Sequence, residues 1–162
     1  MLDASTKRDA HGLIAVRNIH SNTVRYIHQM DRVRNSVEVF KIAPPWNDMN
    51  KTHEGSYDLT TSGVCGTTLG STTFNDPTPD LGDLSVGSAP DGARIYVALR
   101  GPYPLSVSHA AQGSCPGLGI VTLSPNRKSG ELTHVLPSTV LSAGEDKNLS
   151  DPHAVVVRRK LN

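Results

Sequence analysis

The apolar residues of this chain come in short runs separated by turn residues, and no long segment repeats its apolar positions every 3.6 residues. In several runs, apolar and polar residues alternate, which is typical of strands with one buried face. The chain contains fourteen glycines and eleven prolines, which are residue types that interrupt strands and favour turns. This pattern predicts an all-β fold of short strands. The clearest runs are residues 12–16, 24–30, 36–42, 93–99, 118–124, 132–140 and 151–160.

One hairpin is well defined by the stretch SAPDGARIYVAL, residues 88–99. Pro90 fixes φ for a turn position, Asp91 can bond to its local backbone, and Gly92 can take the positive φ that ends such a loop. The strand that follows is almost continuously apolar. We therefore expect Ile95, Tyr96 and Val97 to be buried, with both faces of the strand covered.

Parts of the chain resemble one another. Asp76-Pro77 and Asp151-Pro152 both stand just before an apolar run, 75 residues apart (151 minus 76). Two further pairs of strands align through Tyr26 with Tyr96 and Val39 with Val121. The repeated unit is predicted to be four short antiparallel strands, as in one blade of a β-propeller. A single meander or sandwich with an unrelated Pro-Asp-Gly turn is the alternative.

The hairpin SAPDGARIYVA and the later stretch DPHAVVV resemble the repeats of YVTN-type, lactonase-like propellers of the WD40/YVTN repeat-like superfamily. The resemblance is best over residues 76–157 and weaker over 12–42. It implies a partial β-propeller of four-stranded antiparallel blades: a degenerate blade at 12–75, the best-defined blade at 76–149, and the first strand of a further blade at 150–162. Within the irregular part of the first blade we place an outer strand over residues 58–68, which are rich in Thr and Val.

Counting blades makes the chain look like a fragment. Closed propellers have typically about four to eight blades, and two to three cannot close a ring. Open blade faces and strand edges would then need further blades, or self-association, to cover them.

Candidate ligand-binding residues follow from the resemblance, because loops that enter inner strands lie near the mouth of a propeller channel. Asp76, Asp80, Asp151 and His153 stand at such loops. The alternative is that they are turn residues that cap local backbone.

No catalytic arrangement is evident in the sequence. Cys115 lies in a G-x-C-x-G stretch, but Pro116 has no N–H to help form an oxyanion hole. Ser106, Ser108 and His109 have no identifiable acid partner, and none of the seven histidines falls in a metal-binding motif. Whether Cys65 and Cys115 are paired stays open, as does the use of the two N-x-S/T sequons.

The charge balance argues against nucleic-acid binding, since 16 basic residues face 15 acidic ones. Arg32, Arg34 and the basic residues at 158–160 are expected to be solvated surface charges. No run is long enough to span a membrane, and residues 1–12 do not resemble a signal peptide. The sequence assigns no compartment.

The function predicted is therefore a non-catalytic binding or scaffold module for an unidentified protein or small-molecule ligand, with no cofactor. The alternative is a fragment of a lactonase-like hydrolytic propeller, whose site in the axial channel would hold a divalent metal.

Overall fold

The protein is all-β in the computed structural model. Among the described residues there is no helix, and so none that could cross a membrane. The structure describes residues 9–17, 24–42, 52–65, 75–85, 92–101, 113–138 and 150–158.

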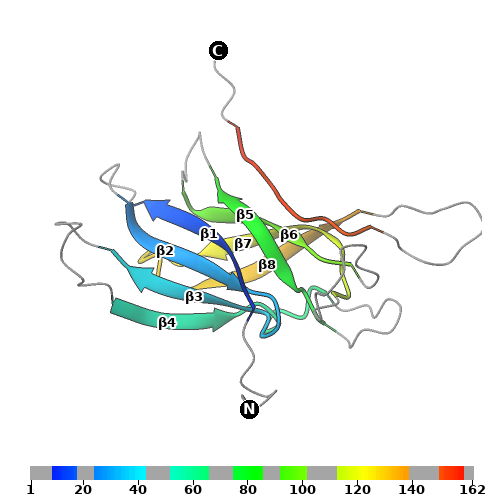
Figure 1. Ribbon diagram of the computed structural model, residues 1–162, viewed down its shortest axis with the longest axis horizontal. Helices are drawn as coiled ribbons and strands as arrows, with labels where there is room; N and C mark the ends of the chain where they lie inside the picture. Colours follow the sequence, from blue (N-terminus) through cyan, green and yellow to red (C-terminus); the bar gives the residue numbers. More distant parts are fainter. Residues whose placement is uncertain are drawn as a thin grey trace, which may run out of the picture.

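Eight strands form two four-stranded antiparallel sheets, each with its strands in chain order (Figure 1). Sheet 1 consists of β1 (Ala10–Arg17), β2 (Val24–Asp31), β3 (Ser36–Lys41) and β4 (Thr52–Asp58). Sheet 2 consists of β5 (Pro79–Leu84), β6 (Arg94–Leu99), β7 (Gly117–Leu123) and β8 (Gly130–Pro137). The prediction of an all-β fold built from four-stranded antiparallel units is confirmed, whereas the described strands do not close into a ring.

The alternating pattern of β2 and β3 decides which face of sheet 1 is buried. Tyr26, His28 and Met30 on β2 are buried, as are Val37 and Val39 on β3. Because successive side chains of a strand point to opposite faces, these residues line one face of the sheet. This face packs against sheet 2.

The fourth strand of sheet 1 differs from the prediction, which placed an outer strand over residues 58–68. The strand is β4, Thr52–Asp58, and it pairs with β3. It ends at Asp58, whose Oδ1 accepts hydrogen bonds from the backbone N–H and the hydroxyl of Thr60, both at 2.7 Å. This side-chain cap favours a turn over continued strand, so local hydrogen bonding overrides the β-propensity of the threonines that follow.

In sheet 2, the β5–β6 hairpin has Gly92 at φ 66°, as its place in the turn predicts; Pro90 and Asp91 lie outside the described residues. Ile95 and Val97 are fully buried as expected, but Tyr96, on the opposite face of β6, is only half-buried. The prediction of a strand covered on both faces is therefore wrong for β6 at Tyr96.

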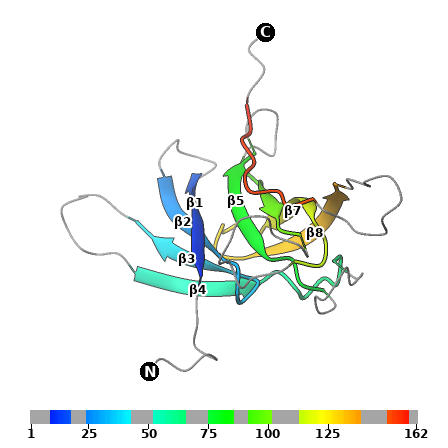
Figure 2. The ribbon, with the colours of Figure 1, turned by 45° about the vertical axis from the view of Figure 1, so that its right-hand side comes forward.

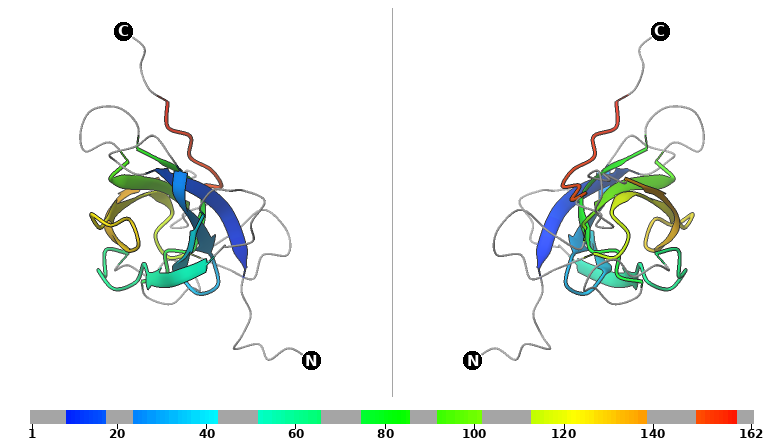
Figure 3. Two further views of the ribbon diagram at one scale, coloured as in Figure 1. Left: turned by 90° about the vertical axis from the view of Figure 1, so that its left-hand side faces the viewer. Right: turned by 90° about the vertical axis from the view of Figure 1, so that its right-hand side faces the viewer.

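The two sheets face each other across a shared core (Figures 2 and 3). β1 lies against β5, and β4 touches β8. Gly82 of β5 lies against the backbone of β6 and close to β1, which leaves no room for a side chain. A side chain there would overlap the Tyr96 carbonyl and press on Ile14 of β1. The core combines apolar side chains of both sheets, chiefly Ile14, Val16, Met30, Val37, Val39, Leu59, Ile95, Val97, Leu99, Val121 and Leu132.

One buried histidine ties the two sheets together. His28 on β2 is fully buried. Its Nε2 lies 2.9 Å from the Arg127 carbonyl oxygen in the β7–β8 turn, and its Nδ1 lies 3.0 Å from the Tyr57 hydroxyl on β4. A carbonyl only accepts, so Nε2 carries the proton and Nδ1 accepts from Tyr57. Burial lowers the pKa of His28 to about 4, against a smaller opposing effect of the Arg127 carbonyl.

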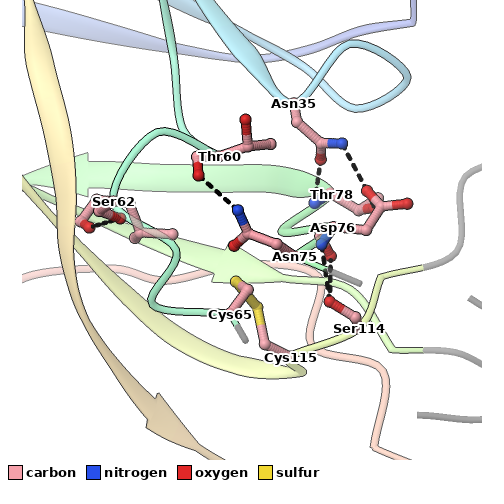
Figure 4. The surroundings of a disulfide bond; sticks show 10 residues. Asn35, Thr60, Ser62, Cys65, Asn75, Asp76, Thr78, Ser114 and Cys115 are labelled. Carbon is pink, nitrogen blue, oxygen red and sulfur yellow. Dashed lines mark hydrogen bonds between the residues drawn. A yellow bond between two sulfur atoms is a disulfide. The ribbon is translucent and has the colours of Figure 1, made fainter. Parts of the chain in front are cut away.

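A disulfide between Cys65 and Cys115 also links the sheets, which settles the pairing that the sequence left open (Figure 4). Cys65 follows β4, and Cys115 precedes β7. The two Cα atoms lie 5.2 Å apart, and the bond closes a loop with a sequence separation of 50. Cys65 is almost completely buried. The cross-link therefore lies inside the contact between the sheets.

Residues 151–158, which we call the strap, run beside β5 without joining either sheet (Figure 1, red). The Leu81 N–H donates to the His153 carbonyl at 3.2 Å, and the Val157 N–H donates to Asp83 Oδ2 at 2.9 Å. The strap thus lies along one side of β5, while β1 lies along the other (Figure 2).

Candidate functional site

A chain of buried charges runs across the start of β1, β5 and the strap. Its centre is the carboxylate of Asp80, which is completely buried. Asp80 Oδ2 accepts a hydrogen bond of 2.8 Å from Arg100 Nη1 and a longer one of 3.4 Å from Arg32 Nη1. Both guanidinium groups are themselves buried. A buried charge is tolerated only when it is paired, so these three side chains need one another.

Each arginine also holds a second carboxylate. Arg32 donates to Asp9 Oδ2 through Nε at 2.8 Å and lies 2.6 Å from it through Nη2. Arg100 makes a two-pronged contact with Asp151, from Nε to Oδ1 at 2.6 Å and from Nη2 to Oδ2 at 2.7 Å. The result is a continuous series, Asp9–Arg32–Asp80–Arg100–Asp151, which we call the Asp–Arg ladder. It joins sheet 1, sheet 2 and the strap.

The backbone places the two arginines at corresponding points. Arg32 comes directly after β2, and Arg100 comes directly after β6. The Arg32 N–H donates to the Asp9 carbonyl and the Arg100 N–H to the Thr78 carbonyl, each at 3.1 Å. Each bond extends the pairing of the first two strands of its sheet by one residue. The side chains therefore leave the two sheets at the same end, where the ladder forms.

The strap can approach Arg100 because residue 101 is glycine. A Cβ at Gly101 would overlap the Ser150 carbonyl oxygen. The Gly101 N–H also lies 3.3 Å from Asp151 Oδ1 and adds a third donor to that carboxylate. The lack of a side chain at Gly101 therefore allows the strap to begin directly beside it.

Two histidines flank Asp80 at the edge of the ladder. His11 Nε2 lies 3.3 Å from Asp80 Oδ1, an oxygen that accepts no hydrogen bond from the described residues. His153 Nδ1 lies 3.5 Å from Asp80 Oδ2, and His153 Nε2 lies 3.3 Å from Asp151 Oδ2. Their side chains are 36% and 48% exposed. The two imidazoles therefore lie between the buried Asp80 carboxylate and solvent.

The electrostatics of the ladder favour its charged state. Burial by itself raises the pKa of Asp151, but hydrogen bonds from Arg100 and from the Gly101 N–H outweigh it, so the pKa is lowered. Burial opposes the charge on Arg100 too, yet Asp151 and Asp80 raise its pKa above the ordinary value. Three carboxylates face two guanidinium groups, so the ladder itself carries one more negative than positive charge.

Of the four residues predicted from the sequence, the structure brings three together: Asp80, Asp151 and His153. Asp76 has different partners (Figure 4). Its Oδ1 accepts from Asn35 Nδ2 at 2.6 Å and from the Thr78 hydroxyl at 3.1 Å, and its backbone bonds to Ser114. Asp76 therefore lies outside the group formed by Asp80, Asp151 and His153. Asp76 holds loops together, as the turn-capping alternative expects.

Sequence reasoning missed Asp9, His11, Arg32 and Arg100, and it placed Arg32 on the surface. Arg32 is 1% exposed, so that prediction is wrong: carboxylates on two strands pair the charge inside the fold. A signal for the ladder was present. Asp80 lies 71 residues after Asp9 and 71 before Asp151 (80 minus 9; 151 minus 80), and Asp-x-His occurs at 9–11 and again at 151–153.

The ladder is poorly suited to hold a metal ion. Its buried carboxylates are turned to guanidinium groups, and a cation placed beside them would be repelled by Arg32 and Arg100. Among the described residues, no group of three or more His, Cys, Asp or Glu side chains is arranged to bind one. What the ladder does is fasten three strand-like segments side by side.

Comparisons with known proteins add no family. No family model, no curated protein and no solved structure matches this chain.

Proposed function

We propose that this chain is a repeat segment of a propeller-like array and serves as a non-catalytic binding or scaffold module. The observation that carries the proposal is the Asp–Arg ladder. Three aspartates at equal intervals, just before β1, on β5 and on the strap, are joined by an arginine from each sheet. In a repeat array, each unit is stabilised by contacts with its neighbours. An ion pair that recurs with the repeat and links successive units supplies such a contact.

The arrangement of strands supports the same proposal. Each sheet is a meander in chain order, and the first strand of sheet 1 lies beside the first strand of sheet 2, with the strap next in line. Blades of a propeller follow one another in this way. The YVTN-type resemblance of the β5–β6 hairpin is consistent with it.

A binding role is favoured over catalysis by the state of the charged groups. A general acid or base needs a side chain that can exchange a proton with a substrate. Asp80 and Asp151 are instead held by arginines, and both carboxylates are nearly inaccessible to solvent. The sheet faces that point away from the core offer surface for a protein or small-molecule ligand.

The alternative, a fragment of a lactonase-like hydrolytic propeller with a divalent metal in its channel, is favoured by one observation. Two imidazoles, His11 and His153, reach the same buried carboxylate from solvent. For Asp80 to serve as a ligand, however, its contact with Arg100 would have to break.

The proposal is tested by lengthening the array. Residues 80–150 span one period of the repeat. A second copy of them, inserted after residue 150, would add one more four-stranded unit and one more arginine–aspartate link to the Asp–Arg ladder. We expect one cooperative urea transition at a higher midpoint than in the parent chain, because each added unit contributes an interface. A separate transition, or a lower midpoint, would contradict the proposal.

Measuring bound metal distinguishes the scaffold role from the hydrolytic alternative. The parent chain is dialysed against Ca²⁺, Mn²⁺ or Zn²⁺, and the retained metal is counted by mass spectrometry, with a His153→Ala variant as the control. The scaffold role predicts no stoichiometric metal and no difference between the two proteins. About one ion per chain that is lost in the variant would favour the hydrolytic alternative.

A further inference from the structure

Two segments of similar sequence lie on opposite sides of β5. Residues 9–16 read DAHGLIAV, and residues 151–158 read DPHAVVVR. Both begin with Asp-x-His, continue with a small residue, and then become aliphatic. The first segment contains β1 and the second is the strap, so β5 has a β1-like segment on each side.

The two segments also make corresponding contacts. Asp9 binds the Nε and Nη2 side of Arg32, and Asp151 binds the Nε and Nη2 side of Arg100. Both histidines reach Asp80, His11 at Oδ1 and His153 at Oδ2. The side of β5 that holds the strap therefore accepts a segment of the β1 type.

We propose that the strap is an internal occupant of a docking site for β1 of a second copy of this chain. When the strap leaves, sheet 1 of that copy binds to the outward face of sheet 2 in a head-to-tail contact. The inference rests on the proposed function, and it names a second copy of the chain as the partner of sheet 2.

The second copy can bind without unfolding, because Asp9 keeps room for another arginine. Its side chain is 31% exposed, although Arg32 already holds it. Asp80 demonstrates that one carboxylate here accepts two guanidinium groups, Arg32 and Arg100, at the same oxygen. Arg100 of the first copy could therefore contact Asp9 of the second in the way that Arg32 contacts Asp80 within one chain.

The outward faces of both sheets carry apolar side chains that such a contact would cover. On sheet 2, Leu136 is 57% exposed, and its neighbours on that face, Leu118 and Ile120, are half-buried. On sheet 1, Leu13 is 67% exposed and Phe40 is half-buried. Burying exposed apolar surface favours association.

Among the described residues, the strap is held by polar contacts: Asp151 binds Arg100 and the Gly101 N–H, and the His153 side chain reaches Asp80. Hydrogen bonds with Leu81 and Asp83 hold its backbone, whereas Val156 is 85% exposed. In a contact between copies, Asp9 of the second copy would pair with Arg100 in place of Asp151. Apolar side chains on the two outward faces would also become buried. Because the contact is head-to-tail, each copy would still present one free face, and the assembly would grow beyond a dimer.

The test is to weaken the strap in the full chain and follow association by sedimentation velocity over a range of concentrations. Asp151→Asn removes the charge that pairs with Arg100. Asp83→Ala removes the acceptor of the Val157 N–H and loosens the same segment by an independent route. We expect each variant to associate at least about tenfold more tightly than the parent chain. Lys128→Gln, an exposed side chain in the β7–β8 turn that lies on neither sheet face, is the control and should behave like the parent.

Competition identifies the site. The peptide DPHAVVVR, in excess, should dissociate the assembly of the Asp151→Asn variant, and NPHAVVVR should be about tenfold weaker. The double variant Asp9→Asn/Asp151→Asn should not assemble. Folded strap variants that associate no more tightly than the parent, or an assembly indifferent to the peptide, would overturn the inference. If the tandem-repeat protein still unfolds as one unit, the proposed function survives that result.

Discussion

Acid should destabilise this protein mainly through one buried imidazole. His28 has a pKa of about 4 in the fold, and the ordinary value is 6.5. A histidine whose pKa is lowered by folding contributes stability above its unfolded pKa, and that stability is lost as the pH falls toward the folded pKa. Between pH 6.5 and 4 the unfolded chain binds a proton that the native protein does not.

The size of the effect follows from the two pKa values. The full difference corresponds to about 3 kcal/mol of unfolding free energy. Between about pH 7.5 and about pH 4.5, linkage gives a loss of about 2.5 kcal/mol from this group alone. The structural reason is burial, because the charged imidazolium would have to lie in the core away from water.

The assay is urea denaturation at several pH values on the parent chain and on His28→Gln, whose neutral amide keeps a donor and an acceptor. The parent should lose about 2.5 kcal/mol more than the variant over that range. His134→Gln, on the exposed surface of β8, is the matched control and should follow the parent. Parallel losses in the parent and His28→Gln would refute the reasoning. Imidazole ¹⁵N shifts provide a check that needs no variant: His28 should remain neutral at about pH 5.

Two further predictions concern the links between sheets. Asp80→Asn leaves Arg32 and Arg100 buried without the central carboxylate and should cost about 3–5 kcal/mol in urea denaturation, whereas Lys128→Gln, which removes an exposed pair with Glu54, should leave the midpoint unchanged. Equal effects of the two changes would contradict the role of the ladder. Replacing both cysteines with serine should lower the unfolding free energy by about 4 kcal/mol, as expected for closure of a 50-residue loop. An unchanged midpoint under reducing conditions would argue against that bond.

Strand positions were predictable where one face of a strand is apolar. The alternation through Tyr26, His28 and Met30 marks the buried face of β2, and Gly92 marks a turn. β4 was misplaced because it contains few apolar residues. Its sequence, THEGSYD, has Tyr57 as its single large apolar side chain, and its place in the sheet comes from pairing with β3. The position of such a strand depends on the strand that it pairs with, which can be distant in sequence.

The ladder was harder to predict because charge alone does not tell whether an arginine is buried. Arg32 and Arg34 are two residues apart, yet Arg32 is buried and Arg34 is exposed. The difference arises from Asp9 and Asp80, which approach Arg32 only after both sheets have formed. Asp80, Asp151 and His153 could be selected because they stand at strand entries. The arginines that bind the two aspartates needed the three-dimensional pairing.

The disulfide sets an order of events in the maturation of the chain. Cys65 is 1% exposed once the sheets have packed, so an oxidant or an isomerase can reach its thiol only before that step is complete. Cys115 is only partly buried, so in the packed, reduced chain it is the thiol that an oxidant reaches first. Cys65 would then displace the oxidant's sulfur from Cys115 and close the bond inside the contact between the sheets.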